Sequence, residues 1–245
     1  MLRSVKQLYG YTLGALDGEI GRVKGFYFDD KDWVVRYLVA DTGSWMPGHK
    51  VLISPYALGS IYPGGRILQV RLTQEKVESS PSIETGLPVA RQHEAAYYRY
   101  HNWPAYWEGP GLWGHSQVPA VPPHYESDAN AEGPSAGEMK EPDSRLRSTL
   151  EVTGYGVQAA DGEIGHVEDF LIEDRNWAIK SLVIATGHWW SGKNVLVSRK
   201  SIERVSWADA EVVLNLTKAA LMEDPEYEHA APGSGDQGPR LFWHS

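Results

Sequence analysis

The sequence predicts a mainly β protein of two small, partly open β-barrels related by internal duplication, with short helices and a Pro/Gly-rich linker. The pentapeptide DGEIG occurs at residues 17–21 and again at 161–165. The flanking residues match without a gap, and about half of the aligned positions are identical. Each copy contains runs rich in β-branched residues between turn residues, which is typical of short strands.

The repeats divide the 245 residues into four parts. We expect a first barrel domain over 1–81, an aromatic helix and flexible linker over 82–147, a second barrel domain over 148–228 and a flexible tail over 229–245. Each repeat is of a size that can just sustain its own core. We therefore expect both copies to adopt the same fold.

Each repeat opens with a hairpin signal. Asp-Gly at Asp17–Gly18 and at Asp161–Gly162 lies between apolar runs, and glycine tolerates the positive φ that a tight hairpin requires. In the strand that follows, Gly25 interrupts the apolar spacing between Val23 and Phe26. This irregularity predicts a β-bulge.

The rest of the repeat also reads as short strands. Runs begin at Trp33 (WVVRYLVADTG), Lys50 (KVLIS) and Ile67 (ILQVRL), and the last alternates apolar and polar residues. Thr73 stands where an N-cap would open a short helix. Five or six strands in so small a unit leave two open edges, and closure into a partly open barrel is the usual solution.

The pattern from YGYTLGALDGEIGRV to RYLVADTGSWMPGHKVLISP resembles the PRC-barrel domain. That domain is shared by the cytoplasmic part of the photosynthetic reaction-centre H subunit and the C-terminal half of a ribosome-maturation factor. The resemblance covers roughly residues 4–81 and 148–225. The tandem arrangement is most similar to bacterial PRC-barrel proteins of unassigned function. It implies a small-barrel fold that elsewhere serves protein–protein contact.

Residues 82–147 join the repeats. VARQHEAAYYRYHNW can form a helix of about three turns, begun after Pro88 and stopped before Pro104. The chain then turns to Pro, Gly, Ser and acidic residues, so we expect poor order from about Ser116 to Ser144. Limited proteolysis should cut this stretch first.

Composition excludes several classes of protein. A net charge of −9 argues against direct nucleic-acid binding, because phosphate neutralisation supplies most such affinity. The chain has no cysteine, which excludes disulfides, thiolate zinc sites and a cysteine nucleophile. No apolar stretch is long enough for a signal peptide or a membrane span, so we expect a soluble cytoplasmic protein.

Motifs for catalysis are weak. HEAAY at His93 has Tyr97 where a zinc protease needs its second histidine. Asp17 and Glu19 suit turn chemistry better than paired acid–base catalysis. The histidines after the first repeat are irregularly spaced, and neither a nucleophile elbow nor a phosphate loop occurs. We expect no enzyme, catalytic residue, metal or cofactor.

Candidate interaction residues are charged or aromatic. Arg36 and Lys180 share one repeat position within an apolar strand, either as outward cations beside an acidic residue of a neighbouring strand or as recognition charges. The loop tryptophans either cover their own barrel or present a face to a partner, with self-association weakened by alanine substitution in the second case. The remaining candidates follow the repeats or lie in these loops: Trp45, Trp189, Trp190, His93, Tyr97, Trp103 and Trp107.

These features favour a non-enzymatic protein–protein interaction or scaffold protein that self-associates, with a homodimer as one form. The partner protein is not identified by the sequence. The alternative is an accessory factor in ribosome or RNA maturation that binds a ribosomal protein. A photosynthesis-linked role and an enzyme of unrecognised type rank behind it.

Overall fold

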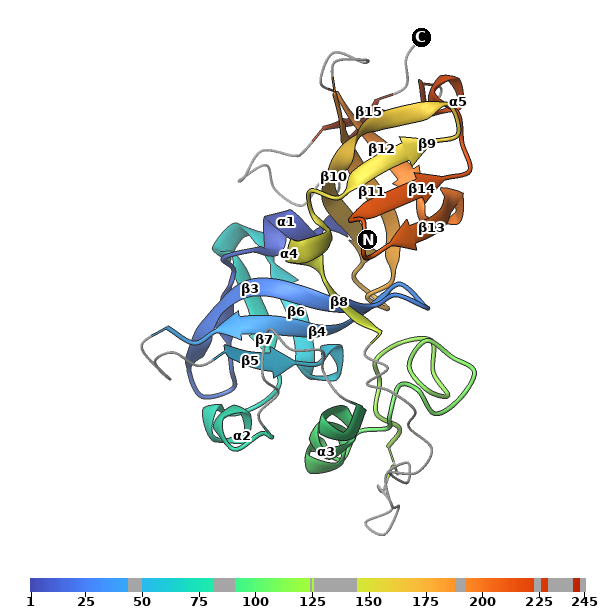
Figure 1. The fold of residues 1–245 in the computed structure, drawn as a ribbon. Coiled ribbons are helices and arrows are strands. Elements are labelled where there is room, and N and C mark those ends of the chain that lie inside the picture. Colours follow the sequence, from blue (N-terminus) through green and yellow to red (C-terminus); the bar gives the residue numbers. More distant parts are fainter. Residues whose placement is uncertain are drawn as a thin grey trace. The chain divides into compact units, whose positions relative to one another are not determined.

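The computed structural model describes residues 1–43, 50–81, 91–123, 125, 145–187, 193–222, 226–228 and 240–242. The fold is mainly β and consists of two compact units (Figure 1). The first-repeat unit comprises Tyr9–Arg147, and the second-repeat unit comprises Met1–Leu8 together with Ser148–Ser245. The first eight residues, assigned above to the first domain, therefore lie with the second repeat.

The first-repeat unit contains a sheet of seven described strands in the order β5-β4-β3-β2-β7-β6, with β8 paired to β3. The pairs β2–β3, β3–β4, β4–β5 and β6–β7 are antiparallel, whereas β2 and β7 are parallel. The elements are β2 (Thr12–Gly14), β3 (Glu19–Asp29), β4 (Val34–Asp41), β5 (Lys50–Ile53), η1 (Pro55–Ala57), β6 (Leu58–Tyr62), η2 (Pro63–Gly65), β7 (Ile67–Val70), α2 (Gln74–Glu78), α3 (Arg91–His101) and β8 (Leu146–Ser148).

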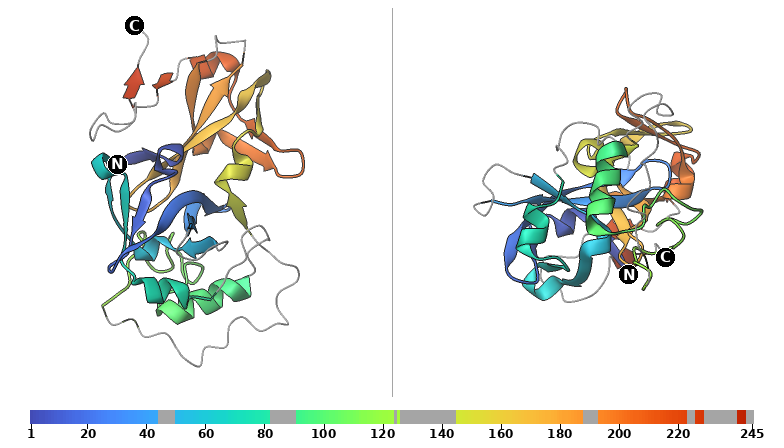
Figure 2. Two further views of the ribbon diagram at one scale, coloured as in Figure 1. Left: turned by 90° about the vertical axis from the view of Figure 1, so that its left-hand side faces the viewer. Right: turned by 90° about the horizontal axis from the view of Figure 1, so that it is seen from below.

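The second-repeat unit repeats this order as β12-β11-β10-β9-β14-β13, and adds β15, β16 and β1. Figure 2 shows most of these strands in yellow to red. The elements are β1 (Leu2–Ser4), α1 (Val5–Leu8), α4 (Thr149–Val152), β9 (Gly156–Ala159), β10 (Gly162–Glu173), β11 (Ile179–Thr186), β12 (Asn194–Ser198), η4 (Arg199–Ser201), β13 (Ile202–Ser206), β14 (Glu211–Leu214), α5 (Lys218–Met222), β15 (Glu226–Glu228) and β16 (Arg240–Phe242). The shared strand order confirms the duplication. Among the described strands, the first and last strands of each order do not pair with each other, so neither sheet closes on itself.

The repeated DGEIG pentapeptide has the same two tasks in both units. Its aspartate, Asp17 or Asp161, accepts the first backbone N–H of the short helix that ends the repeat, at 2.8 Å and 2.9 Å. Its last glycine, Gly21 or Gly165, has φ of 126° or 146°. A Cβ there would lie 2.1 Å or 2.0 Å from a carbonyl oxygen of the neighbouring strand. The motif therefore recurs because each sheet needs this close approach.

Other local predictions are confirmed. The pairing of β3 with β4 shifts register between Val23 and Gly25, where the bulge was expected. Thr73 caps α2 by accepting the N–H of Lys76. The helix α3 lies inside the expected range, and Pro104 follows it. Within the described residues, no helix is long and apolar enough to cross a membrane.

The short strand that precedes each repeat pairs outside that repeat. β1 pairs with β10 of the second repeat, and β8 pairs with β3 of the first. Asp174 donates its N–H to the carbonyl of residue 1 at 3.1 Å, and Asp30 donates to Arg145 at 2.9 Å. Equivalent ion pairs accompany these bonds, namely Arg3–Asp174 at 3.1 Å and Arg147–Asp30 at 2.9 Å. We call this reciprocal arrangement the strand exchange.

Candidate interaction site

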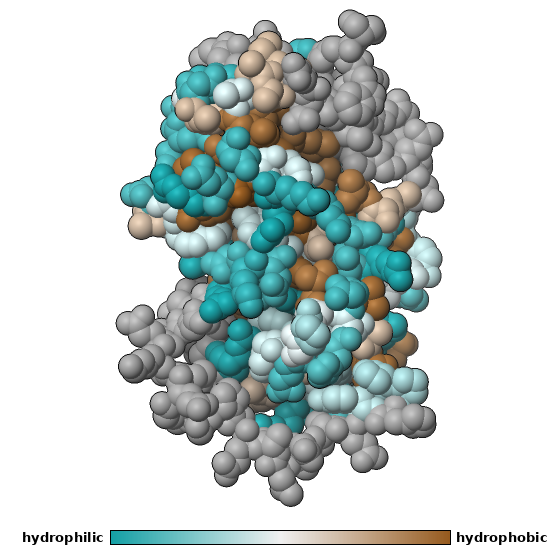
Figure 3. All heavy atoms as spheres, turned by 90° about the vertical axis from the view of Figure 1, so that its right-hand side faces the viewer, coloured by the Kyte–Doolittle hydropathy of each residue, from teal (hydrophilic) through white to brown (hydrophobic). Residues whose placement is uncertain are grey.

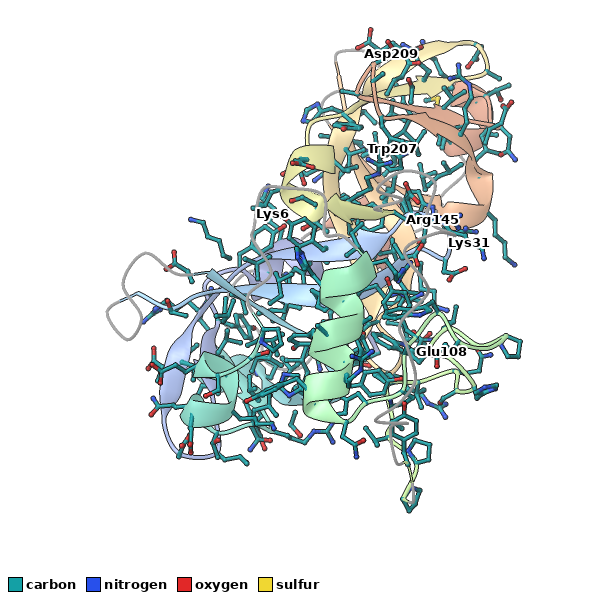
Figure 4. All side chains as sticks on the ribbon, turned by 60° about the horizontal axis from the view of Figure 1, so that its bottom comes forward. Lys6, Lys31, Glu108, Arg145, Trp207 and Asp209 are labelled. Atoms are coloured by element: carbon teal, nitrogen blue, oxygen red, sulfur yellow. The ribbon has the colours of Figure 1, made fainter. Side chains whose placement is uncertain are left out.

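The segment after the first repeat lies against the sheet of the first-repeat unit. Figure 4 shows α3 across that sheet, with the loop that carries Glu108 beside it. We call residues 91–116 the aromatic cap. Five of its aromatic side chains are at most 9% exposed: Tyr97, Tyr98, Trp103, Tyr106 and Trp113. An apolar strand surface and a helix rich in aromatic residues thus bury each other.

Local bonds give the cap loop its shape. Asn102 ends α3 in the left-handed conformation with φ of 53°. Gly114, with φ of 71°, donates its N–H to Tyr106 at 2.9 Å. Trp113 donates to the carbonyl of Ser116 at 2.9 Å. These bonds turn the loop back toward the sheet and aim the Trp113 indole at it.

Arg36 on β4 lies at the centre of the contact and is 0% exposed. Its guanidinium lies 3.9 Å from the ring centroid of Tyr106 and 5.1 Å from that of Trp113. It donates to the Leu112 carbonyl and to Asp32 at 3.1 Å, with Asp29 at 3.4 Å. A buried cation needs such partners, because desolvation without them is expensive.

Glu94 joins the cap to the same strand. Its Oε1 accepts the hydroxyls of Tyr37 at 3.0 Å and Tyr106 at 2.9 Å. Its Oε2 lies 3.0 Å from Arg91. Burial raises the pKa of Glu94, although the arginine and the two hydroxyls oppose the rise. Burial likewise raises the pKa of Tyr37 and Tyr106, so both remain hydroxyl donors at neutral pH.

The turn after β5 supplies further contacts between the sheet and the aromatic cap. Ser54 donates its N–H to the Tyr97 hydroxyl at 3.1 Å, and its own hydroxyl lies 3.2 Å from that of Tyr98. Tyr56 stacks on Trp103 with centroids 5.6 Å apart and meets Trp113 edge-on at 5.3 Å. The hydroxyls of Ser54, Tyr97 and Tyr98 therefore have hydrogen-bond partners while the rings fill the interface.

Ser80 and His101 form a contact that resembles a catalytic dyad. The serine hydroxyl lies 3.1 Å from Nε2 of His101, but Nδ1 is buried without a hydrogen-bond partner. A triad requires an acceptor at that nitrogen to orient the ring. The His101 ring instead stacks on Trp103 with centroids 4.3 Å apart. The contact therefore has the geometry of packing, without the orienting group of a hydrolase.

Stability of the first-repeat unit should depend on His101 in acid. Burial, with a smaller contribution from Lys76, lowers the pKa of His101 to about 4. The unfolded side chain titrates near pH ~6.5. Its stabilising contribution is therefore complete above that pH and is lost as pH falls toward 4. The melting temperature of wild type should fall more steeply than that of His101→Gln over this range. A difference between the two that does not vary with pH would contradict the assignment.

The candidate interaction residues predicted from the sequence differ in their burial. Tyr97 and Trp103 are buried in the cap, Trp107 is half-buried, and His93 is exposed. His93 therefore lies away from the contact that buries Tyr97 and His101. The loop residues Trp45, Trp189 and Trp190 lie outside the described residues. Of the stretch 116–144 that was expected to be poorly ordered, the structure describes residues 116–123 and 125, and Ser116 pairs with Trp113.

Arg36 and Lys180 differ despite their shared repeat position. Arg36 is beside an aspartate of the neighbouring strand, but the cap buries it, which corrects the expectation of an outward cation. The Lys180 side chain is 45% exposed and pairs with Glu173 of the neighbouring strand at 2.9 Å. Only Lys180 therefore remains available as a surface charge.

Sequence reasoning missed several members of the site. They are Tyr37, Ser54, Tyr56, Glu94, Tyr98, Tyr106 and Trp113. The signal that could have revealed them is divergence between the repeats. Tyr37 is matched by Ser181, and Tyr56 by Lys200. A repeat that keeps its strands but loses its large aromatic side chains has lost a surface contact.

Other sites are not indicated by the described residues. They contain no group of three or more His, Cys, Asp or Glu that could hold a metal ion. Hydrophobic side chains are interspersed among hydrophilic ones on the face shown in Figure 3. Singly exposed apolar residues such as Leu16 and Tyr62 are ordinary surface features.

No family model matches the chain, and no curated protein matches it with significant similarity.

Proposed function

We propose that this chain is a non-enzymatic protein-interaction or scaffold protein built from two PRC-type barrel repeats. One observation carries the proposal. The sheet of the first repeat binds a polypeptide segment, the aromatic cap, that lies outside the repeat. The contact is made by Tyr, Trp and Arg side chains, the residue types that dominate binding energy at protein interfaces. A repeat that binds one segment within the chain is suited to bind another from a partner.

The second repeat offers the corresponding position to a partner. Lys180 and Lys200, the counterparts of Arg36 and Tyr56, are exposed. The described residues after α5 form β15 and β16 in place of a helix like α3. Two lysines at this position favour a partner surface with acidic groups. The duplication thus provides one repeat that is capped within the chain and one that presents charge.

The proposal is tested by capturing partners on the full chain in a lysate of the producing cells, then reconstituting binding with the purified partner. Lys200→Glu should weaken that binding by about tenfold or more, since it opposes the complementary charge. Arg204→Glu makes the same charge change at an exposed residue of β13, elsewhere in the same repeat. It should change affinity by less than about twofold.

Self-association should be measured in parallel by sedimentation of the wild-type chain. A second copy that binds saturably, with the same sensitivity to Lys200→Glu, would identify the partner as the protein itself. Turnover of a metabolite by the purified chain would overturn the proposal. So would the failure of every captured protein to bind in reconstitution.

A further inference from the structure

The strand exchange brings a basic segment onto an acidic stretch of β10. The Ser4 hydroxyl and the Lys6 backbone N–H both donate to Asp169, the latter at 2.9 Å. The Lys6 ammonium, labelled in Figure 4, pairs with Glu168. Asp169 is only 1% exposed, and its carboxylate is stabilised by these donors together with the Phe170 N–H at 2.7 Å.

Arg3 extends the contact to the end of the strand. Its Nε lies 3.1 Å from Asp174, and Leu2, Arg3 and Ser4 pair in register with residues of β10. Backbone pairing supplies affinity without regard to sequence, whereas the side-chain contacts supply selectivity. The segment is therefore recognised at three polar positions, Arg3, Ser4 and Lys6.

The first repeat lacks two of these three acceptors. Gly25 stands where the second repeat has Asp169, and Lys24 stands where it has Glu168. Pairing of Leu2–Lys6 with its own repeat would place Lys6 against Lys24 and leave Ser4 without the carboxylate. The counterpart segment, 146–150, carries Leu150 in place of Lys6. An uncharged leucine beside Lys24 creates no repulsion between like charges. Like charges disfavour the wrong partner, so the exchange is encoded by charge.

We propose that Glu168, Asp169 and Asp174 form an acceptor site for an extended basic segment of the pattern Arg-Ser-x-Lys, and that this site selects Leu2–Lys6 over its repeat counterpart. The site recognises side chains and not the covalent connection. It therefore binds the same segment offered by a second copy of the chain. This inference does not depend on the proposed function.

Selectivity within the chain is tested with engineered disulfides in the full chain, which has no cysteine of its own. Leu2→Cys with Glu173→Cys joins residues paired in register and should crosslink under mild oxidation. Leu146→Cys with Glu173→Cys, the matched control, should crosslink about tenfold less. Adding Lys6→Glu should lower the first yield, and Glu168→Lys should restore it. Equal yields for the two pairs would overturn the proposal.

Binding between copies is tested with a fluorescent peptide of residues 1–8 and the full chain carrying Lys6→Glu, whose own segment is weakened. Binding should be saturable and about tenfold tighter than that of a peptide of residues 145–152. Restoring the internal pair with Glu168→Lys should abolish it. Equal affinities for the two peptides, or no saturable binding, would overturn recognition between copies. If Lys6→Glu unfolds the chain, the disulfide yields in the otherwise unchanged background decide selectivity.

Discussion

Replacing Arg36 with alanine should destabilise the first-repeat unit by about 3 kcal/mol or more, because it removes a buried cation from buried partners. The guanidinium lies 3.9 Å from the Tyr106 centroid and 3.4 Å from the buried carboxylate of Asp29. Alanine would remove both interactions and leave a void beneath Trp113. Calorimetry should show one of two thermal transitions moving down while the other stays in place.

Lys180→Ala is the matched control, since it removes the cation at the same position of the second repeat. Its side chain is 45% exposed and pairs with Glu173, so its loss should change stability by about 0.5 kcal/mol or less. Comparable losses of stability for the two variants would show that the aromatic cap adds nothing to the stabilisation provided by Arg36. Arg36→Lys should recover only part of the loss, because lysine cannot stack as a planar group.

Gly21→Ala and Gly165→Ala should each destabilise one unit by about 3 kcal/mol or more. The added methyl group would lie 2.1 Å from the Asp41 carbonyl oxygen in the first case and 2.0 Å from that of Ala185 in the second. Both positions also have a positive φ that alanine rarely adopts. Relief would require separating two central strands of the sheet. Denaturant unfolding measures the loss in each unit.

Gly14→Ala and Gly156→Ala are the controls for these two substitutions. A Cβ at Gly14 would lie at an ordinary distance of 3.6 Å from the Ile67 side chain. A Cβ at Gly156 would have no described neighbouring atom within 4 Å. Both variants should remain within about 1 kcal/mol of wild type. A loss of stability for Gly21→Ala as small as that for Gly14→Ala would show that the two strands do not approach closely at Gly21.

Local features could be predicted from the sequence because their causes are local. The hairpin at Asp17–Gly18, the bulge at Gly25 and the helix α3 follow from backbone preferences and apolar spacing. The duplication followed from direct comparison of the repeats. These predictions needed no knowledge of what packs against what.

The strand exchange could not be predicted in the same way. Leu-Arg-Ser precedes both repeats, at Leu2–Ser4 and Leu146–Ser148, so local sequence favours neither pairing. In our proposal the choice depends on the residue that would face Lys6, which is Glu168 in the observed pairing and Lys24 in the alternative. That difference has a consequence only once the partner strands are known. Long-range pairing is a property of the whole sheet.

The buried site was also only partly predictable. Tyr97 and Trp103 were selected as aromatic candidates, but their partner was unknown. Arg36 is charged and was expected to face outward, because nothing on its own strand indicates a cover from residues 91–116. A tertiary contact overrides the usual exposure of arginine.

The strand exchange also sets the order of events while the chain is being made. Leu2–Ser4 leaves the ribosome before its partner β10, which ends only at Glu173. At about 5–20 residues per second, the segment waits for roughly 10–30 s before it can pair. The first repeat waits as well, since β8 at Leu146–Ser148 completes its sheet. Both exchanged pairings therefore form late in synthesis, and nascent chains stalled before residue 146 should expose an unfilled strand edge to chaperones.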